Sequence, residues 1–283
     1  MSICVKTCGK SRQRAKGRLL SAKRRARTSA SRQAFGPPGV GAGSPAGKIE
    51  APEGPTYAGA DTVDIIVHGI GAHGAAPHSG KDPVLIGSQI VVALQTLVSR
   101  ELAPHSPGVV TVGSFHSGTK HNIISDRAHL QLTVRNTNEK TRKILLDGIE
   151  RIAVNAGRMA GLPEDKLPEV IVSEESVPPT LNDVNLARRL KMSWSEAMGD
   201  DALFEQPPEG MGAEDFPMFT VDPDIKSVYW GIGGTPQEDL DAEDAGGPRV
   251  ASHHSPLFKI SPEPSVRAGV ESTVVALLEL MGD

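Results

Sequence analysis

The chain has 283 residues, of which 38% are hydrophobic and 23% charged, so it is long enough for one large or two ordinary globular domains. Its two cysteines, Cys4 and Cys8, are too few and too close to the start for a disulfide framework or a cysteine-rich zinc site. No apolar run approaches the roughly 20 residues that span a bilayer, so the sequence predicts no transmembrane helix.

The net charge of -4 hides an asymmetry along the chain. Residues 1–48 hold twelve of the 30 Lys and Arg residues and none of the 34 Asp and Glu residues, which leaves 18 basic and 34 acidic residues in the remainder. Residues 1–46 also lack apolar periodicity, and such a composition buries too little surface to offset chain entropy. We therefore predict a basic disordered tail over residues 1–46.

This tail has three other interpretations. The basic run at residues 23–27 is compatible with nucleic-acid contact, and the acid-poor, Arg- and Ser-rich composition resembles a transit peptide. An error of reading frame or gene prediction would also produce such a stretch. Because no apolar segment follows the basic residues, we expect no secretory signal. We expect a cytoplasmic protein that has no membrane contact and does not bind nucleic acid.

From residue 62 the pattern becomes regular. An apolar strand is predicted over residues 63–67, and Gly69-Ile-Gly-Ala-His-Gly-Ala-Ala-Pro-His78 follows it. Three glycines in six positions indicate a sharp turn, and two imidazoles in such a turn favour a functional site. Asp82 and Pro83 then predict the N-cap and first residue of a helix, whose apolar spacing continues until Pro104.

Two strands are predicted next, over residues 109–115 and 123–134, with the turn-forming residues 117–122 between them. Asn138 predicts the cap of a second helix, which ends at residues 161–163, and residues 170–172 predict a closing strand. The order strand, helix, strand, strand, helix, strand over residues 62–173 is typical of the ferredoxin-like module. We therefore predict a four-stranded antiparallel sheet with both helices on one face.

A second unit is predicted after the two prolines at residues 178–179. It has a helix capped by Asn182 or Asp183 and ended by Gly199, a loop at 210–216, a strand near 227–231 and a loop at 233–236. An acidic, turn-rich segment and a final helix over about residues 264–280 complete it. Because this region has few strands for its length, it is typical of part of an α/β sheet domain.

Seven motifs together resemble those of the N-acyl-amino-acid amidohydrolases of the hippurate hydrolase and auxin-conjugate hydrolase type. They are the Gly/His turn of residues 69–78, Asp82-Pro83, Val110-Thr-Val-Gly113, Gly118-Thr-Lys-His-Asn-Ile-Ile124, Thr133-Val-Arg135, Glu214-Asp-Phe216 and His254-Ser-Pro256. These enzymes belong to a family of dinuclear-metal metallopeptidases, including aminoacylases, in which a ferredoxin-like lid interrupts the catalytic domain and forms the dimer. The resemblance implies an α/β protein with a lid over residues 62–173, a partial catalytic domain over residues 47–61 and 174–283, and a homodimer formed through the lid.

The resemblance also implies a chemistry, the metal-dependent hydrolysis of the amide bond of N-acyl amino acids, in which two Zn or Mn ions activate a bridging water. His73 matches the lid histidine that reaches the partner subunit's site and stabilises the oxyanion. Asn122 and Arg135 match lid positions that hold the substrate carboxylate, and His254 matches the C-terminal metal ligand. The plainer interpretations are a surface ion pair for Arg135, a turn-shaping role for Asn122 and an ordinary loop pair for His253 and His254.

One departure from the family concerns the metal ligands. The family's first half supplies a Cys-Gly-His-Asp motif, a bridging acid and a Glu-Glu pair, and none of these precedes Gly47. Glu174-Glu175 follows the lid instead of preceding it, so we interpret it as a solvated turn, and Glu214-Asp215 as a structural loop pair. We hypothesise that an upstream frameshift or mispredicted start removed that half and left little or no activity. The alternative is a non-catalytic dimerisation or binding protein that uses the lid and the basic tail.

Overall fold

The structure is a computed structural model, and it describes residues 32–35, 39–206, 210–220 and 225–282. Contacts divide these residues into two compact units. The base unit comprises residues 32–35, 39–52, 183–206 and 225–282, and the ferredoxin-like unit comprises residues 53–182 and 210–220. The stretch predicted from the sequence as an inserted module, residues 62–173, lies inside the ferredoxin-like unit.

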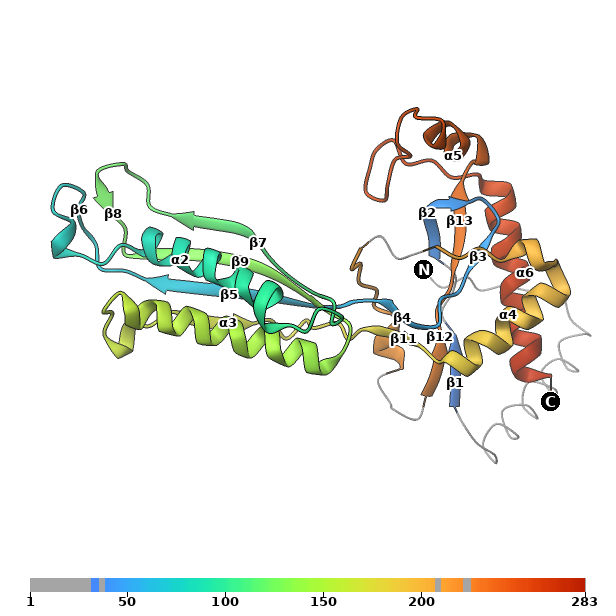
Figure 1. The fold of residues 1–283 in the computed structure, drawn as a ribbon, viewed down its shortest axis with the longest axis horizontal. Coiled ribbons are helices and arrows are strands. Elements are labelled where there is room, and N and C mark those ends of the chain that lie inside the picture. The colour runs from blue at the N-terminus through green and yellow to red at the C-terminus, as the bar shows by residue number, and fades with distance from the viewer. Residues whose placement is uncertain (1–31, 36–38, 207–209, 221–224, 283) are drawn as a thin grey trace, which may run out of the picture. The chain divides into compact units, whose positions relative to one another are not determined.

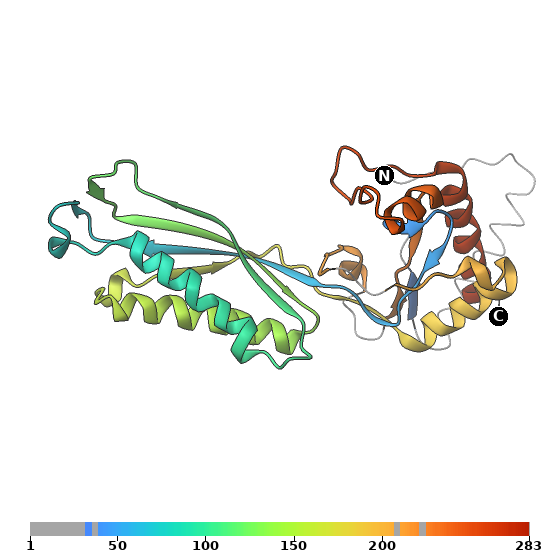
Figure 2. The same ribbon diagram turned by 45° about the horizontal axis from the view of Figure 1, so that its top comes forward.

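The ferredoxin-like unit is built on a four-stranded antiparallel sheet with strand order β10-β5-β9-β7. Helices α2 and α3 both cover one face of this sheet (Figures 1 and 2). The elements are β5 (Gly59–His68), α2 (Pro83–Thr96), β7 (Gly108–Ser117), β9 (Arg127–Asn136), α3 (Glu139–Met159) and β10 (Glu169–Val172). The predicted order of elements and the predicted sheet with two helices on one face are both confirmed.

Shorter elements complete this unit. They are β4 (Gly54–Tyr57) paired with β11 (Thr180–Asn182), β6 (Ala72–His73) paired with β8 (Ile123–Ile124), and the helical turns η1 (Pro77–Ser79), η2 (Leu97–Glu101), η3 (Glu164–Lys166) and η5 (Phe216–Phe219). The loop that contains Glu214 and Asp215 is held at the residue that follows β4, since the Ala58 amide donates to the Gly212 carbonyl at 2.7 Å. Glu174 and Glu175 are exposed between β10 and β11, as a solvated turn requires.

The predicted helix caps are present. The Asp82 carboxylate accepts from the Val84 amide at 2.8 Å, with Pro83 as the first residue of α2. The side-chain oxygen Oδ1 of Asn138 accepts from the Thr141 amide at 2.9 Å at the start of α3. Each cap satisfies an amide that has no partner inside the helix, which fixes where the helix begins.

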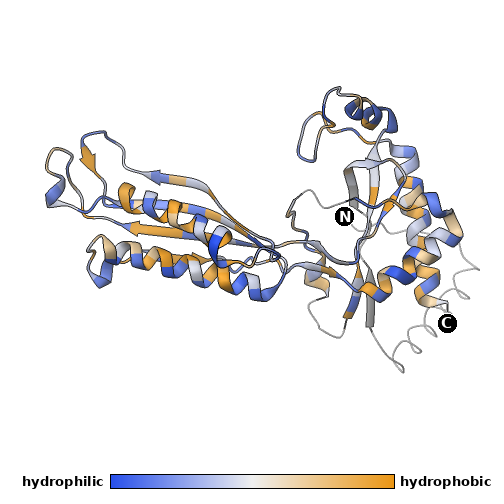
Figure 3. Cartoon of the chain, in the orientation of Figure 1, coloured by the Kyte–Doolittle hydropathy of each residue, from blue (hydrophilic) through white to orange (hydrophobic). Residues whose placement is uncertain are grey.

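The core of this unit lies between the sheet and the two helices. Alternate residues of β9 share the buried face, as predicted for Leu130, Leu132 and Val134, while α2 contributes residues one helical turn apart. Figure 3 shows the apolar colouring of α2 and of the strands beneath it. The buried members from α2 and the turn after it are Ile86, Ile90, Leu94 and Leu97.

One finding departs from the expectation of no membrane-spanning helix. The continuous helical stretch Pro83–Glu101 has 19 residues and is long and apolar enough, by length and composition only, to cross a membrane. The sequence assessment missed it because polar residues such as Ser88 and Gln95 interrupt the apolar run. Its buried residues contact the sheet of its own unit, so we interpret it as a core helix of that unit.

The base unit contains two small groups of strands and three helices. Strand β1 (Arg32–Phe35) pairs in parallel with β12 (Ile225–Val228), and β13 (Gly231–Thr235) lies between β2 (Gly39–Pro45) and β3 (Ile49–Glu50). The helices are α4 (Val184–Met198), α5 (Gln237–Asp244) and α6 (Pro262–Met281), with the turn η4 (Asp200–Ala202). Asp183 caps α4, as predicted, and Gly199 ends it.

Several predictions for this unit are wrong. One strand was predicted near residues 227–231, but β12 ends at Val228 and β13 begins at Gly231, and the acidic segment predicted to be turn-rich contains α5. Disorder was predicted over residues 1–46, but residues 32–35 and 39–45 form strands, while residues 1–31 lie outside the described part. Residues 233–236 were predicted as a loop, but β13 continues through Thr235. The errors at β1, β2 and β13 arise because these strands are held by pairing with distant segments, which composition does not report, and because β2 and β13 are also glycine-rich. At Gly233 a Cβ would lie only 1.8 Å from the Pro45 carbonyl oxygen, so this pairing requires glycine.

Candidate functional site

The first part of the candidate site is at one end of the ferredoxin-like unit, where two loops that are distant in sequence meet. His73 of β6 pairs with Ile123 of β8, and the Gly74 amide donates to the Asn122 carbonyl at 2.8 Å. A Cβ on Gly74 would lie 3.0 Å from the Asn122 carbonyl carbon, so glycine permits this close approach. The structure thus brings His73 and Asn122, two of the predicted site residues, together.

The His73 imidazole is exposed, and a local contact fixes its tautomer. Its Nδ1 accepts a hydrogen bond from the Ala75 amide at 3.0 Å. A ring nitrogen that accepts a hydrogen bond carries no proton, so the proton of the neutral ring is on Nε2. Nε2 is therefore a hydrogen-bond donor, as a group that stabilises an oxyanion must be.

An open pocket of about 560 Å³ lies beside this pair. Residues from both loops and from the start of α2 line it, with Lys120 and His121 as its basic groups and Asp82 as its acidic one. His78, which the sequence placed in the same turn, lies in η1 and is exposed. The pocket is lined by chain neighbours of His73 and Asn122, but neither His73 nor Asn122 is among its lining residues.

Arg135 lies at the opposite end of the same sheet. It pairs with Ala60 and Val109 one residue before the end of β9, whereas the His73 end is fixed near Arg127, where the Gly69 amide donates to the Asp126 carbonyl at 2.7 Å. The eight residue-to-residue steps from Arg127 to Arg135 span about 26 Å in an extended strand. Within one chain, Arg135 is therefore not in the same site as His73 and Asn122.

The Arg135 side chain is available for a ligand. Across the described residues, no hydrogen bond or ion pair is found for its guanidinium, which is partly exposed. The predicted alternative, an ordinary surface ion pair, thus has no partner in this part of the chain. A free guanidinium fork is suited to a carboxylate, which it binds through two parallel hydrogen bonds.

His254 belongs to the base unit, in an exposed loop before α6. It has φ of 65°, and among residues that the structure describes it is the one non-glycine residue with positive φ. Such backbone is uncommon outside glycine and is concentrated at functional positions. Its neighbour His253 is held in place: its Nε2 accepts from the Ala42 amide at 3.0 Å, and its ring lies 5.1 Å from that of Phe258.

A metal centre does not form from the described residues. They contain no group of three or more His, Cys, Asp or Glu side chains placed to hold an ion, and His254 therefore has no co-ligands among them. A dinuclear Zn or Mn site needs several ligands, including a bridging carboxylate. The donor set of the described residues does not fit such a centre.

Sequence reasoning missed one carboxyl group of the base unit. Burial raises the pKa of Glu50, while hydrogen bonds from Ser44 and Gln206 act in the opposite direction. The Ser44 hydroxyl donates to Glu50 Oε2 at 3.2 Å, and the Gln206 amide donates to Ser44 Oγ at 2.9 Å. Gln206 is distant in sequence from Ser44 and Glu50, so no local motif indicates the whole cluster.

Comparison with known proteins agrees with the fold. The peptidase dimerisation domain matches residues 58–158. The N-acetyldiaminopimelate deacetylase of Leuconostoc mesenteroides is 34% identical over 175 residues, which cover 61% of this chain and 43% of that protein. The IAA-amino acid hydrolase ILR1-like 4 of Arabidopsis thaliana is 31% identical over 219 residues, which cover 77% of this chain and 47% of that protein.

Two further relatives come from Bacillus subtilis. The protein YhaA is 34% identical over 217 residues, covering 77% of this chain and 51% of YhaA. The crystal structure of YXEP, a dinuclear metal binding peptidase from the M20 family, has a TM-score of 0.64 at 20% identity and covers 88% of this chain and 57% of that chain. The chain thus spans about half the length of the curated relatives it matches.

Proposed function

Because the chain belongs to the M20 peptidase family, we propose that it supplies the lid and part of the catalytic domain of an amidohydrolase that cleaves the amide bond of N-acyl amino acids of the hippurate type. The observation that carries the proposal is the position of the three lid residues. His73 and Asn122 are at one end of the sheet, and Arg135 is about 26 Å away along β9.

A homodimer formed through the ferredoxin-like unit would combine these residues in one site. A substrate carboxylate is only a few ångströms wide, so Asn122 and Arg135 of the same chain cannot both hold it. In a two-fold symmetric dimer each contact occurs twice, so the end of one lid that carries Asn122 would meet the partner's Arg135 in each of two sites. The match to a peptidase dimerisation domain supports this arrangement.

Each residue then has a definite task. The Arg135 fork binds the carboxylate of the amino acid through two hydrogen bonds, and the Asn122 side-chain amide donates to the same group. The Nε2 proton of His73 donates to the oxygen of the scissile carbonyl as negative charge develops there. We propose His254 as a metal ligand, although the described residues alone do not fit a dinuclear Zn or Mn centre.

Binding of a matched pair of ligands tests the carboxylate site. We expect the chain to bind N-benzoylglycine more tightly than N-benzoylglycinamide, which lacks the carboxylate, and Arg135→Gln to abolish the difference. Arg100→Gln, a change of the same kind at an exposed arginine of η2, should leave it intact. Equal affinity of the unaltered chain for both ligands would contradict the assignment of Arg135.

Mixing two defective chains tests the shared site. Asn122→Ala and Arg135→Gln should each lose binding as homodimers. A mixed dimer would regain one intact site, so random mixing should restore about a quarter of the original sites. No recovery would mean that the residues act within one chain. If light scattering gives the mass of a monomer for the unaltered chain, the homodimer is contradicted.

Measurements of activity and metal content test whether this chain is a weakly active or inactive form of the enzyme. We expect little or no hydrolysis of N-benzoylglycine by this chain with added Mn or Zn. Elemental analysis that found about two ions per chain, together with normal turnover, would overturn the expectation of weak activity.

A second function, a non-catalytic dimerisation or binding protein, is favoured by one observation: the described residues form no metal-binding cluster. Because residues 32–35 and 39–45 pair with the base unit, any interaction arm is limited to residues 1–31. A salt-sensitive association with an acidic partner, lost when residues 1–31 are removed, would support this function. Association that persists without them would contradict it.

A further inference from the structure

The face of the ferredoxin-like sheet opposite α2 and α3 carries two imidazoles side by side (Figure 2). The register of β7 with β9 places His116 directly opposite His129, so both side chains project from the same face. Their neighbours identify that face, because Phe115 of β7 packs against the core and Leu130 of β9 is buried in it. Successive residues of a strand point to opposite sides, so the two histidines lie on the face away from the helices.

A carboxylate on the other side of β9 holds the His129 ring. Asp64 Oδ1, on β5, forms a hydrogen bond with His129 Nε2, and it also accepts from the Gln131 side-chain amide at 3.2 Å. The side chains of His129 and Asp64 are 35% and 30% exposed, so both are partly shielded from water. An ionised carboxylate accepts hydrogen bonds and donates none, so the proton of the neutral His129 ring is on Nε2. Its Nδ1 therefore has a free lone pair.

The arrangement has the elements of a metal site with two imidazole ligands. His116 is exposed, and within the described ranges its ring makes no hydrogen bond or ion pair. A neutral imidazole nitrogen binds Zn²⁺, Ni²⁺ or Cu²⁺ readily. A histidine that binds a metal almost always donates its other ring N–H to a carboxylate, a carbonyl or water. His129 has this environment, because β9 lies between β5, which carries Asp64, and β7, which carries His116.

We propose that His116 and His129 bind one divalent transition-metal ion such as Zn²⁺ across β7 and β9, with Asp64 orienting His129 and water completing the coordination. The site has two protein ligands, in keeping with the finding that the described residues form no group of three or more. Mg²⁺ and Ca²⁺ prefer oxygen ligands, so this site selects against them. The inference does not rest on the proposed function, because none of these three residues has a task in it.

An ion at this position would restrain the end of β7. His116 is followed by Ser117, the last residue of β7, and the next five residues lead to Asn122. By joining β7 to β9 there, the ion would fix the start of the loop that carries Asn122. We therefore assign it a structural role, separate from any dinuclear centre.

Titration of the full chain with Zn²⁺ at neutral pH, followed by calorimetry, tests the site. His116→Ala and His129→Gln should each lower the affinity by about tenfold or more, because each removes one of the two protein ligands. Asp64→Asn should lower it by about tenfold, since it removes only the carboxylate that orients His129. His105→Ala, at an exposed histidine of the loop before β7, is the control and should leave the affinity unchanged. Mg²⁺ should give no binding heat.

The position of the ion is measured separately. Cu²⁺ is paramagnetic and broadens the NMR signals of nearby nuclei, so residues 114–117 and 127–131 should lose intensity before residues near His73 or His254. Without metal, His116→Ala should unfold at the temperature of the unaltered chain because His116 is exposed, which separates loss of a ligand from loss of the fold. Broadening centred on His73 or His254, absence of saturable Zn²⁺ binding, or unchanged affinity in His116→Ala would each overturn the proposal.

Discussion

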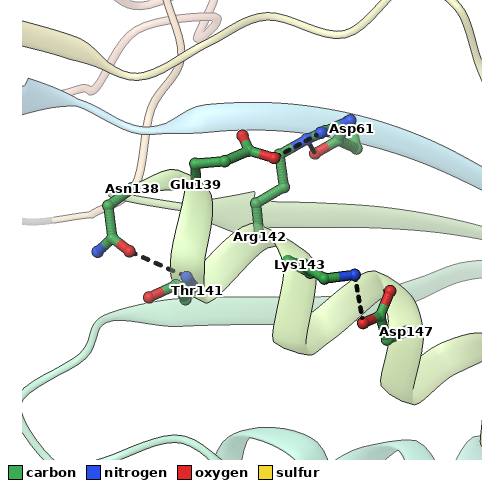
Figure 4. Close-up of polar contacts among 7 residues, drawn as sticks. All are labelled: Asp61, Asn138, Glu139, Thr141, Arg142, Lys143 and Asp147. Atoms are coloured by element: carbon green, nitrogen blue, oxygen red, sulfur yellow. Dashed lines mark hydrogen bonds and ion pairs between the residues drawn. The ribbon is translucent and has the colours of Figure 1, made fainter.

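Arg142 of α3 encloses the fully buried carboxylate of Asp61 on β5, with Nη2 2.8 Å from Oδ1 and Nε 3.0 Å from Oδ2 (Figure 4). The guanidinium is only partly exposed, and its hydrogen bonds to Asp61 raise the pKa of Arg142. The pair connects the first strand of the ferredoxin-like sheet to the first turn of its second helix. It is thus a structural ion pair that fixes α3 on the sheet.

Removal of Arg142 should therefore destabilise this unit. Arg142→Met keeps most of the apolar stem but leaves the Asp61 carboxylate buried without its cation, which we expect to cost about 3 kcal/mol of unfolding free energy. Lys143→Met, one residue along, removes an exposed pair with Asp147 and should cause no measurable change. Urea unfolding followed by circular dichroism measures both variants. Equal stability of the two variants would contradict a structural role for the buried pair.

The close approach of Gly74 to Asn122 predicts a local effect at the candidate site. Gly74→Ala would place a Cβ 3.0 Å from the Asn122 backbone, so the two loops must separate by a few tenths of an ångström. We expect amide chemical shifts to change at residues 72–75 and 122–124, with unfolding free energy within about 0.5 kcal/mol of the original. Gly71→Ala meets the Ile124 carbonyl oxygen only at 3.4 Å and is the control. Identical spectra for both variants would show that the approach is not tight.

Ser272 links α6 to the paired tryptophans of the base unit. Ser272→Ala removes the hydroxyl that accepts from Trp230, and we expect a loss of about 1 kcal/mol of unfolding free energy. The bond from Trp194 should persist because it uses the Ser272 carbonyl. Ser88→Ala, at an exposed hydroxyl of α2, serves as the matched control. Tryptophan fluorescence during unfolding reports the base unit directly, and an unchanged midpoint for Ser272→Ala would refute the prediction.

The raised pKa of Glu50 predicts a pH dependence of stability. Between the ordinary value of 4.5 and its raised value, the folded state binds more protons at Glu50 than the unfolded state does. The stability contributed by this group is therefore complete below the ordinary pKa and declines as pH rises through the raised value. Glu50→Gln removes this loss, so its stability relative to the original chain should be greater at pH 7 than at pH 4.

Denaturant titrations at the two pH values measure this effect. Glu174→Gln makes the same change at an exposed carboxylate and should give no comparable difference between the two pH values. A Glu50→Gln variant whose relative stability is the same at pH 4 and pH 7 would contradict the effect of burial on Glu50.

Local signals in the sequence were sufficient for most of the ferredoxin-like unit. The carboxylate of Asp82 and the amide of Asn138 cap helices within three residues, and alternation along β9 places Leu130 and Leu132 on the buried face. The same local signals placed Asn122 in a turn, whereas His73, predicted in the glycine-rich turn, is the last residue of β6 just before the turn. These features depend on residues that are close in the chain, so a short stretch of sequence is enough to predict them.

Long-range contacts decided the remainder. The pairing of β1 with β12 and of β2 with β13 overturned the prediction of disorder, because backbone hydrogen bonds to distant strands leave no trace in composition. Likewise, a sequence motif does not report distance along a strand, so only the fold separates Arg135 from His73. The exposure of Val270 was also decided by long-range contacts. Trp194 and Trp230, which lie on other elements, pack on the opposite side of α6 at Ser272 and leave Val270 exposed.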